Sequence, residues 1–367
     1  MKRVKAAVSR KDSDLFHLEE LTLEDPRPDE VLVRFTAAGL CHTDLEVAAG
    51  RMPTPFPVVL GHEGTGVVET VGSSVTGFSP GDRVVASLSF CGTCKNCLKG
   101  LPSYCPLQYP LNFGAQRADG SVGLRDGSGE PVHDHFFGQS SFAGYGLCRP
   151  HSLIKVPDSA APDHVLAPLG CGVITGAGAV WNVLRVTPGS TVAAFGAGAV
   201  GLSAVMAASA AGAARIIVSD LHASRRELAT QLGATDVVDA TAGAVEQILE
   251  LTGGQGVDFS VESTGIPEVM SQAVAVLASL GSAAILGVAP DGAELRTNAF
   301  ALLEGRTVAG SIVGHQAPAV LVPRVLDLHS KGRFPLEALI RTYPLDHINK
   351  AVDDTRSGAT VKAVLLH

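Results

Sequence analysis

The run G-A-G-A-V-G at 196–201 limits the folds open to this chain more than any other segment. It follows the apolar stretch T-V-A-A-F at 191–195, opens an Ala-rich segment, and precedes Asp220 at the end of R-I-I-V-S-D. A dinucleotide-binding βαβ unit typically contains a strand, a glycine-rich turn, a helix and a second strand that ends on an acidic residue. Without that context, glycines at this spacing would indicate only a flexible turn.

Each glycine of this run has a separate task in such a unit. Gly196 allows the tight turn, Gly198 lets a pyrophosphate approach the backbone, and Gly201 permits close contact between helix and strand. The N-terminus of the following helix then faces the phosphates. Asp220 can accept hydrogen bonds from the adenosine ribose hydroxyls and would repel a 2′-phosphate. We therefore expect NAD rather than NADP as the cofactor.

Strand-like and helical segments alternate through the rest of this region. The runs V-D-F-S-V-E at 257–262 and S-A-A-I-L-G at 282–287 are typical of buried strands, and 224–232 has helical character. This alternation predicts an α/β domain with a doubly wound parallel sheet. Residues 1–90 instead contain short β-branched runs broken by Gly and Pro, which indicate a β-rich domain. A chain of 367 residues exceeds what one core usually supports, so two domains are expected.

The segment C-G-T-C-K-N-C-L-K-G-L-P-S-Y-C at 91–105 brings four cysteines close together. Four thiolates at such spacing can surround one Zn²⁺ tetrahedrally, each sulfur about 2.3 Å from the metal. The alternative, four unrelated cysteines, is disfavoured because the whole chain has only seven. A closed four-sulfur shell leaves no open coordination position, so this zinc is expected to be structural and to hold a lobe with few apolar residues.

Three further motifs place a cysteine or histidine among glycines: G-L-C-H-T-D at 39–44, G-H-E-G-T-G at 61–66 and L-G-C-G-V-I-T-G at 169–176. Each such residue alone is more often part of a packed core. Taken with a nucleotide-binding fold, Cys41, His62 and Cys171 form a set of two sulfurs and one imidazole with one vacancy. Catalytic zinc in alcohol dehydrogenases has this ligand set.

Composition and charge exclude several classes of partner. The chain has 28 Lys and Arg against 36 Asp and Glu, a formal charge of −8, and no basic run, so nucleic acid and anionic lipid are not expected. The start M-K-R-V-K-A-A-V-S turns polar at Ser9, before the apolar core of a signal peptide can form. The apolar stretch 192–218 is interrupted by glycines and indicates strand, turn and helix rather than a membrane span. We expect a cytoplasmic protein whose cysteines serve as thiolates.

These motifs, in this order, resemble those of the zinc-containing medium-chain alcohol dehydrogenases over essentially the full length of the chain. The resemblance implies a β-rich GroES-like catalytic domain over 1–172 and 318–367 and a Rossmann NAD-binding domain over 173–317. The stretches Q-Y-P-L-N-F at 108–113 and F-F-G-Q-S-S-F at 136–142 are most similar to the aryl-alcohol (benzyl alcohol) dehydrogenases. The implied activity is reversible, NAD-linked oxidation of a primary aryl or allylic alcohol to the aldehyde. Two zinc ions per chain and a homodimer or homotetramer are implied as well.

The resemblance also assigns roles to the matching residues. It implies a catalytic zinc on Cys41, His62 and Cys171, and a structural zinc on Cys91, Cys94, Cys97 and Cys105. Near the catalytic zinc it implies Glu63 beside the metal, Asp44 orienting the ligand imidazole and Thr43 on the substrate oxygen. For the cofactor it adds to the glycines and Asp220 the residues His42, Thr175, Val200, Arg225, Val288 and Lys362. The substrate pocket is expected to contain bulky Tyr109, Phe136 and Phe137, with small Ser87 leaving room for a ring.

Two positions depart from the family pattern. Many relatives carry Arg at the position of His42, which contacts the pyrophosphate, and a His there is expected to hold NADH less firmly. Liver-type relatives end their proton relay on a His, and the matching residue here is Glu46. The sequence leaves two alternatives for Glu46: it replaces that His as the terminal base, or it faces solvent and plays no part.

Three other functions compete with this interpretation. Glutathione-dependent formaldehyde dehydrogenases share C-H-T-D and G-H-E-G, but they carry an Arg where this chain has Tyr109. Polyol dehydrogenases tend to replace the third zinc ligand by Glu, whereas Cys171 is present here. A nucleotide-binding structural protein that lost catalysis would not need the complete set of catalytic zinc ligands. The sequence alone leaves open the physiological alcohol, the preferred direction, and the choice between dimer and tetramer.

Overall fold

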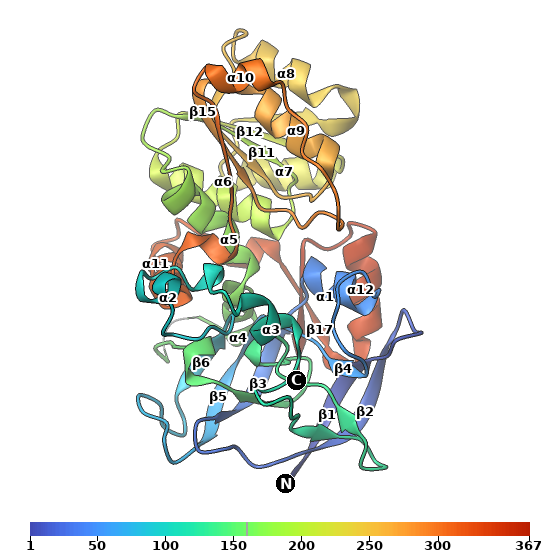
Figure 1. Ribbon diagram of the computed structural model, residues 1–367. Coiled ribbons are helices and arrows are strands. Elements are labelled where there is room, and N and C mark those ends of the chain that lie inside the picture. The colour runs from blue at the N-terminus through green and yellow to red at the C-terminus, as the bar shows by residue number, and fades with distance from the viewer. Residues whose placement is uncertain (159–160) are drawn as a thin grey trace. The chain divides into compact units, whose positions relative to one another are not determined.

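The computed structural model describes residues 1–158 and 161–367, which form two compact units (Figure 1). The first unit comprises Met1–Cys171, Ala317–Leu326 and Leu339–His367, and the second comprises Gly172–Gln316 and Asp327–Ala338. The sequence-based boundary put the whole tail from 318 with the first domain, whereas Asp327–Ala338 lies with the second unit. Within that segment Phe334 is fully buried, and its ring lies 6.3 Å from that of Trp181.

Two antiparallel-rich sheets form most of the first unit. The smaller has the order β4 (Val58–Val59), β1 (Lys2–Ser9), β2 (Phe16–Leu23), β7 (Leu124–Arg125) and β8 (Pro131–Val132). The larger has the order β10 (Leu153–Lys155), β6 (Arg83–Ala86), β5 (Gly64–Val71), β3 (Val31–Gly39), β18 (Lys362–Leu366) and β17 (Ile340–Pro344), with β9 (Tyr145–Cys148) also paired to β3. These strands confirm the predicted β-rich character of the N-terminal part.

The strand β3 is central to the larger sheet because it pairs with other strands along both of its edges. Its residues Val31, Val33 and Phe35 are buried in one core cluster, while Arg34 points outward, as expected for side chains that alternate along a strand. One edge pairs with β5, and the other pairs first with β9 and then, at its C-terminal end, with β18. The strand β18 therefore lies beside the segment that leads from β3 to Cys41.

The helices of the first unit are short. They are α1 (His42–Ala48), α2 (Lys95–Leu98), α3 (Gln108–Phe113), α4 (Asp163–Leu166) and α12 (Ile348–Arg356), with 3₁₀ turns η1 (Pro102–Tyr104), η2 (Phe136–Gly138), η3 (Pro150–Ser152), η4 (Ala167–Gly170) and η9 (Leu345–His347). The helix α11 (Pro318–Ser330) begins in the first unit and ends in the second. Between β6 and β9 the chain has only short elements.

A single parallel sheet forms the centre of the second unit. Its order is β13 (Asp236–Asp239), β12 (Arg215–Asp220), β11 (Thr191–Phe195), β14 (Val257–Glu262), β15 (Leu277–Ile285) and β16 (Thr307–Gly310). Counted from β11, this is the order 3-2-1-4-5-6 of a Rossmann sheet, whose direction of winding switches between β11 and β14. The predicted α/β fold with a doubly wound parallel sheet is confirmed.

Helices and turns connect these strands. They are α5 (Gly172–Gly178), the π-helix η5 (Ala179–Val183), α6 (Ala199–Ala211), α7 (Ala223–Gln231), α8 (Ala244–Leu251), α9 (Pro267–Ala275) and α10 (Ala299–Leu303), with 3₁₀ turns η6 (Ala240–Ala242), η7 (Val313–His315) and η8 (Leu336–Leu339). Among the described residues, no single helix is long and apolar enough to cross a membrane. The segments Asp163–Gly170 and Gly172–Val183 satisfy the length and composition requirements only as a bent pair.

Candidate active site

Four potential metal ligands from three separate parts of the first unit meet at one point. Cys41 precedes α1, His62 and Glu63 precede β5, and Cys171 follows η4. One ligand atom from each lies within 4.8 Å of those of the other three. His62 is buried, and the two cysteines are partly buried and form no disulfide. This cluster can hold a metal ion.

The orientation of His62 leaves one ring nitrogen available to a metal. Its Nδ1 lies 2.9 Å from Oδ1 of the fully buried Asp44, which also accepts a hydrogen bond from the backbone N–H of Gly61. The other carboxylate oxygen of Asp44 accepts from the backbone N–H of Cys41 at 3.0 Å. The Nε2 of His62 is buried and has no hydrogen-bond partner among the described residues. Since an unpaired buried nitrogen is costly, its position fits coordination to a metal ion.

The electrostatics of the cluster favour a thiolate at Cys41. The neighbouring Cys171 thiol holds the pKa of Cys41 well below its ordinary value, against the opposing effect of burial. The same contact raises the pKa of Cys171. For His62, burial opposes the charged form, but the Asp44 carboxylate and the Cys41 thiolate together raise its pKa. A cation at the centre of this group would neutralise the concentrated negative charge.

A buried ion pair lies next to the cluster. The ammonium group of Lys362, at the start of β18, lies 2.9 and 3.0 Å from the two carboxylate oxygens of Glu63 and donates a further bond to Leu40 O at 3.1 Å. Both side chains are almost completely buried. Burial raises the pKa of Glu63, and the Lys362 charge opposes this shift. These contacts occupy the ammonium group and favour an internal role for Lys362 over the predicted cofactor contact.

Aromatic side chains cover one side of His62. Phe137 stacks on the imidazole with ring centroids 4.5 Å apart, and Phe136 approaches it edge-on at 5.7 Å. Phe113 contacts both phenylalanines and stacks on Tyr109, which is nearly half exposed. The structure thus brings three of the four predicted substrate residues into one group of contacts, which we call the aromatic wall (Tyr109, Phe113, Phe136 and Phe137). Phe113 was not predicted, although it ends the quoted run Q-Y-P-L-N-F.

The fourth predicted substrate residue has a different environment. Ser87 is buried just after β6, and its hydroxyl donates to Gly170 O at 2.5 Å, the residue before Cys171. Its own carbonyl accepts a hydrogen bond from the side chain of Gln139. Through these contacts Ser87 lies beside the metal-ligand cluster and stabilises the main chain before Cys171.

The helix α1 carries four of the predicted residues, of which Asp44 is the hydrogen-bond partner of His62. Thr43 is half-buried in its first turn, whereas His42 is exposed and its Nε2 lies 3.2 Å from Oε1 of Glu46. Arg51, which sequence reasoning missed, binds both oxygens of Glu46 at 2.6 and 2.7 Å. Its only signal in the sequence is its place five residues after Glu46.

Four of the other five cysteines form a second cluster, around α2. The sulfurs of Cys91, Cys94, Cys97 and Cys105 all lie within 4.8 Å of one another. The backbone N–H groups of Cys94 and Cys97 point at the sulfurs of Cys91 and Cys94, at 3.3 and 3.5 Å. Backbone N–H groups of Thr93 and Cys94 lower the pKa of Cys91 to about 6. This donor set fits a four-coordinate zinc with no open position.

The glycine-rich turn of the second unit has the geometry that the sequence suggests. Gly196 has φ +89, a Cβ on Gly201 would lie 1.8 Å from Gly196 O, and a Cβ on Gly198 would meet open space. Asp220 is buried, and its two oxygens accept hydrogen bonds from the backbone N–H groups of Ala197 and His222 at 2.7 and 2.8 Å. Each oxygen keeps a second lone pair, so both can still accept a ribose hydroxyl.

The remaining predicted cofactor residues lie at different points of the second unit. Thr175 is buried in α5, Val200 lies in the first turn of α6, and Val288, just after β15, is 45% exposed. Arg225 is in α7, and its Nε is buried without a hydrogen-bond partner among the described residues. A buried guanidinium nitrogen without a partner fits an anionic ligand.

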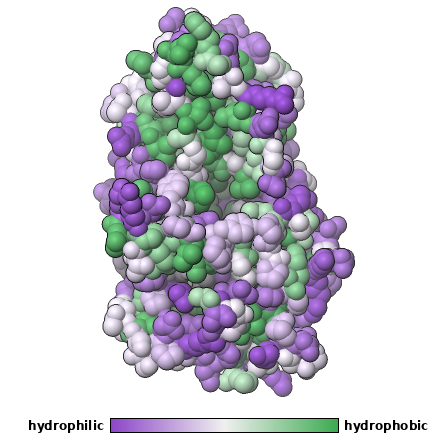
Figure 2. All heavy atoms as spheres, in the orientation of Figure 1, coloured by the Kyte–Doolittle hydropathy of each residue, from purple (hydrophilic) through white to green (hydrophobic). Residues whose placement is uncertain are grey.

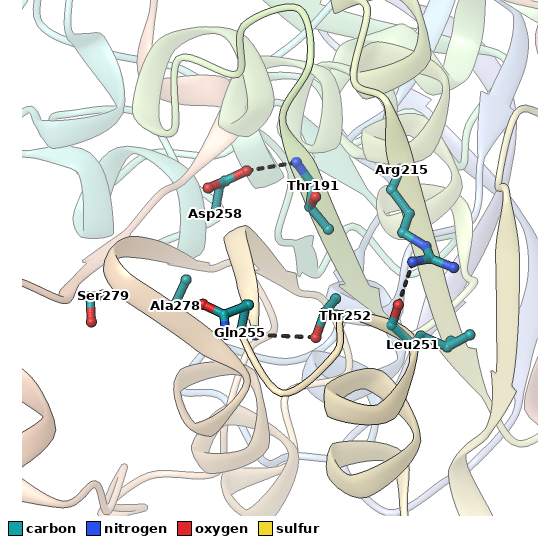
Figure 3. A pocket seen from close by; sticks show the side chains of 9 residues that line it. Thr191, Arg215, Leu251, Thr252, Gln255, Asp258, Ala278 and Ser279 are labelled. Carbon is teal, nitrogen blue, oxygen red and sulfur yellow. Dashed lines mark hydrogen bonds between the residues drawn. The ribbon is translucent and has the colours of Figure 1, made fainter.

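A pocket of about 520 Å³ lies elsewhere in the second unit, at the amino ends of the strands. Its lining consists of Thr191, Arg215, Leu251, Thr252, Gln255, Gly256, Asp258, Ala278 and Ser279. Figure 3 shows that its charged groups are used internally, since Arg215 bonds Leu251 O and Asp258 accepts from Thr191 N. Sheets of this kind bind ligands at the carboxyl ends of their strands, so this pocket is not the cofactor site.

Comparisons with known proteins agree with both units. Residues 27–158 match the alcohol dehydrogenase GroES-like domain, and residues 199–329 match the zinc-binding dehydrogenase family. Geraniol dehydrogenase from Castellaniella defragrans is 44% identical over 365 residues, which cover 98% of this chain and 97% of that protein. The chain belongs to the zinc-binding alcohol dehydrogenases.

Two solved structures of this dehydrogenase family are similar over the whole chain. The alcohol dehydrogenase zinc-binding domain protein from Burkholderia ambifaria has a TM-score of 0.97 at 48% identity, covering 100% of this chain and 99% of that one. Benzyl alcohol dehydrogenase from Acinetobacter calcoaceticus has a TM-score of 0.95 at 42% identity, with the same coverage. The predicted family is confirmed.

The family assignment settles the general activity and the kind of cofactor. The protein is a zinc-dependent alcohol dehydrogenase that acts on a small-molecule alcohol. Its cofactors are zinc and a nicotinamide dinucleotide. The roles of individual residues, the number of zinc ions and the identity of the alcohol require further argument.

Proposed function

We propose that this dehydrogenase oxidises primary aryl or allylic alcohols to aldehydes, reversibly and with NAD. One observation carries the proposal: the aromatic pair Phe136 and Phe137 packs directly on His62, a member of the metal-ligand cluster. We infer that a substrate whose oxygen reaches that cluster places its carbon substituent along this wall. Flat apolar groups gain more from such a surface than an ethyl group does.

The residues of the first unit divide into ligands and supports. Cys41, His62 and Cys171 would hold the catalytic zinc, which when bound lowers the pKa of a coordinated hydroxyl to about 7. Asp44 fixes the ring of His62 by its 2.9 Å hydrogen bond. Thr43, half-buried two residues after Cys41, would accept the proton of the alcohol and pass it on.

We propose NAD rather than NADP for a reason local to β12. The Asp220 carboxylate ends that strand in a buried position and is held rigidly by two backbone N–H groups. A fixed carboxylate accepts ribose hydroxyls and repels a 2′-phosphate. The exposed His42 would contact the pyrophosphate, as the family resemblance implies. We assign catalysis to the first unit and most of the cofactor contacts to the second.

The four-cysteine cluster would hold a second, structural zinc, giving two zinc ions per chain. Its lobe has little apolar core of its own: Leu98 and Leu107 are exposed, and the helix α2 buries no residue. A metal can replace the missing core. Two sets of free thiolates also suit a reducing compartment, which supports a cytoplasmic location.

The edge of the second unit's sheet supports a homo-oligomer. Within the described residues β16 is the last strand of its sheet, next to β15, and all four of its residues are exposed. The neighbouring α10 exposes Phe300 and Leu303 by 68% and 80%, and Figure 2 shows hydrophobic residues at the surface in this region. An exposed edge strand is a template for pairing with another chain. We propose that β16 of a second copy completes it in a homodimer, which a tetramer could contain twice.

Steady-state rates of NAD reduction test the substrate proposal. We expect kcat/KM to be several-fold to many-fold higher for benzyl alcohol and an allylic terpene alcohol than for ethanol, because each buried CH₂-sized group adds roughly 0.8 kcal/mol. S-hydroxymethylglutathione should be a poor substrate, since Tyr109 stands where a carboxylate-binding Arg would be needed. Equal or higher kcat/KM with ethanol would refute the aryl and allylic assignment.

A further inference from the structure

The buried amide of Gln139 joins the metal ligand His62 to the aromatic wall. Gln139 is 1% exposed, and its Nε2 donates to His62 O at 3.0 Å and to Ser87 O at 3.1 Å. Its Oε1 accepts from the backbone N–H of Gly64 at 2.9 Å. The two N–H groups and the carbonyl of this side chain are therefore all bonded to main-chain groups. Two of the three bonds flank Glu63, one to the carbonyl of the residue before it and one to the N–H of the residue after it.

The segment that carries Gln139 has an unusual backbone. His135, Phe137 and Ser140 have φ values of +63, +51 and +52, in the left-handed region that residues with a side chain seldom occupy. Such conformations persist only where the surroundings hold them in place. Ser140 does so on one side, because its hydroxyl donates to Val59 O at 2.6 Å and accepts from the N–H of Phe136 at 2.9 Å. Gln139 also holds this segment in place, through its hydrogen bonds to the main chain of His62, Gly64 and Ser87.

Gln139 connects two parts of the site. The first is the main chain of His62, whose imidazole belongs to the metal-ligand cluster. The second is the turn that contains Phe136 and Phe137, whose rings contact that imidazole. The carboxamide therefore determines how far the aromatic wall stands from the metal ligand. A hydrophobic residue of the same size would fill the space but would make none of the three bonds.

We propose that Gln139 is a positioning residue for this dehydrogenase: it holds the His62 ligand and the aromatic wall at a fixed separation, and so sets both metal retention and the preference for ring-bearing alcohols. The second effect rests on the proposed aryl or allylic substrate, whereas the first does not. Residues that support metal ligands from outside typically change metal affinity or activity by ~10–100-fold when replaced.

The test compares Gln139→Met with a matched control, Asn112→Leu. Asn112 is also a fully buried carboxamide with three main-chain bonds, to the N–H and carbonyl of Ser89 and to Gln108 O, but it has no bond to His62. Both variants replace the amide by an apolar group of similar size. Two properties of the zinc-loaded enzyme are measured: the rate at which zinc passes to a chromogenic chelator, and kcat/KM for benzyl alcohol and ethanol.

We expect Gln139→Met to accelerate one phase of zinc release by about tenfold or more and to lower the benzyl-to-ethanol ratio of kcat/KM several-fold, mainly through KM for benzyl alcohol. Asn112→Leu should lose comparable thermal stability without accelerating zinc release; its substrate preference is not compared, because Asn112 lies in α3 between Tyr109 and Phe113. Unchanged release and preference in Gln139→Met, or an equal acceleration of zinc release in Asn112→Leu, would overturn the proposal. If Gln139→Met does not fold, Gln139→Glu, which keeps the volume and the acceptor but loses both donors, provides the same comparison.

The two proposals fail in different ways. If the wild-type enzyme prefers ethanol, the substrate assignment is wrong, and zinc release still decides the role of Gln139. If benzyl alcohol is preferred and zinc release does not respond to Gln139, the substrate assignment stands and the positioning role is lost.

Discussion

Arg51 binds Glu46 through two parallel hydrogen bonds, with Nη2 and Nε 2.6 and 2.7 Å from the two carboxylate oxygens. This contact lowers the pKa of Glu46, and His42 lies 3.2 Å from the same carboxylate. The Glu46 side chain is only 18% exposed. Neither sequence-based alternative describes this arrangement well: a carboxylate held by a guanidinium is a weak base, and Glu46 does not simply face solvent. We propose that Glu46 fixes His42 and Arg51.

The first prediction concerns this group. Glu46→Gln should lower kcat by less than about tenfold and leave the shape of its pH profile unchanged, because a general base is worth typically ~10²–10⁴ in rate. The measurement is kcat for the preferred alcohol from pH 6 to 10, with Thr43→Ala as the comparison, which should lose nearly all activity. A loss of more than about 100-fold in Glu46→Gln, with a displaced pH limb, would instead identify Glu46 as the terminal base.

The second prediction separates the two metal sites. Cys97→Ser removes one sulfur from the lobe around α2 and should mainly lower thermal stability. Cys171→Ser should leave the fold nearly intact and abolish turnover, since its sulfur belongs to the cluster with Cys41 and His62. Metal analysis should find two zinc ions per wild-type chain and one in each variant. A single zinc ion in a fully active wild-type chain would contradict this division.

The third prediction concerns cofactor choice. NAD should be preferred over NADP by at least ~10²-fold, or about 3 kcal/mol, as several polar contacts at Asp220 would give. Asp220→Ser should raise KM for NAD and lower KM for NADP. Arg225, whose Nε has no partner in the described part of the chain, offers a cation nearby that would assist the phosphate in the variant. Comparable kcat/KM for the two cofactors in the wild type would show that Asp220 does not meet the ribose.

The fourth prediction is a pH dependence of stability that arises at His135, the residue before Phe136 of the aromatic wall. His135 is buried; burial opposes its charge, but Asp134 at 2.6 Å and Glu30 at 3.4 Å raise its pKa from 6.5 to about 9. A group whose pKa is higher in the folded state stabilises that state fully below pH 6.5, and the contribution disappears as pH rises through about 9. We expect the free energy of unfolding to fall by at most about 3 kcal/mol over this window.

The control for this effect is His135→Asn, because Asn tolerates the left-handed backbone at this position. Urea unfolding of both proteins at pH 6.5, 7.5, 8.5 and 9.5 gives the measurement. The variant should be less stable at pH 6.5 and should lose less stability toward pH 9.5, so the two curves converge. Parallel curves would mean that His135 is uncharged in the folded protein.

Local patterns predicted the second unit well. The predicted strand T-V-A-A-F coincides with β11, and the predicted strand R-I-I-V-S-D coincides with β12. Both strands could be predicted because the residues within and next to them indicate buried strands and turns. The predicted strand at 282–287 is less accurate, since β15 already begins at Leu277. The residues A-S-L-G at 278–281 form an irregularity in this strand, because the pairing with β14 shifts from Val257 opposite Leu277 to Phe259 opposite Ser282.

Long-range contacts of the site could not be predicted in the same way. Lys362 is 299 residues from Glu63, and Gln139 is 77 residues from His62. Neither pair shares a motif, and each meets only because β18 and the turn at 136–138 pack beside the same segment. Sequence patterns identified the metal ligands because their chemistry is distinctive. They did not identify the amide and the ammonium group that support the ligands, because Gln and Lys in most positions face solvent.

The pairing of β18 with β3 fixes an order of events during synthesis. The ribosome makes β3 and the segment 41–63 early, then the whole of the second unit, and only afterwards the residues that supply Lys362. Until then Glu63 is a carboxylate without its ammonium partner, beside the thiols of Cys41 and Cys171. The nascent N-terminal sheet is therefore left with an open edge and an uncompensated charge while the nucleotide-binding sheet, continuous from β11 to β16, can already fold. All four potential metal ligands are thus made before Lys362, so the ion pair of Glu63 is the last part of this centre to be completed.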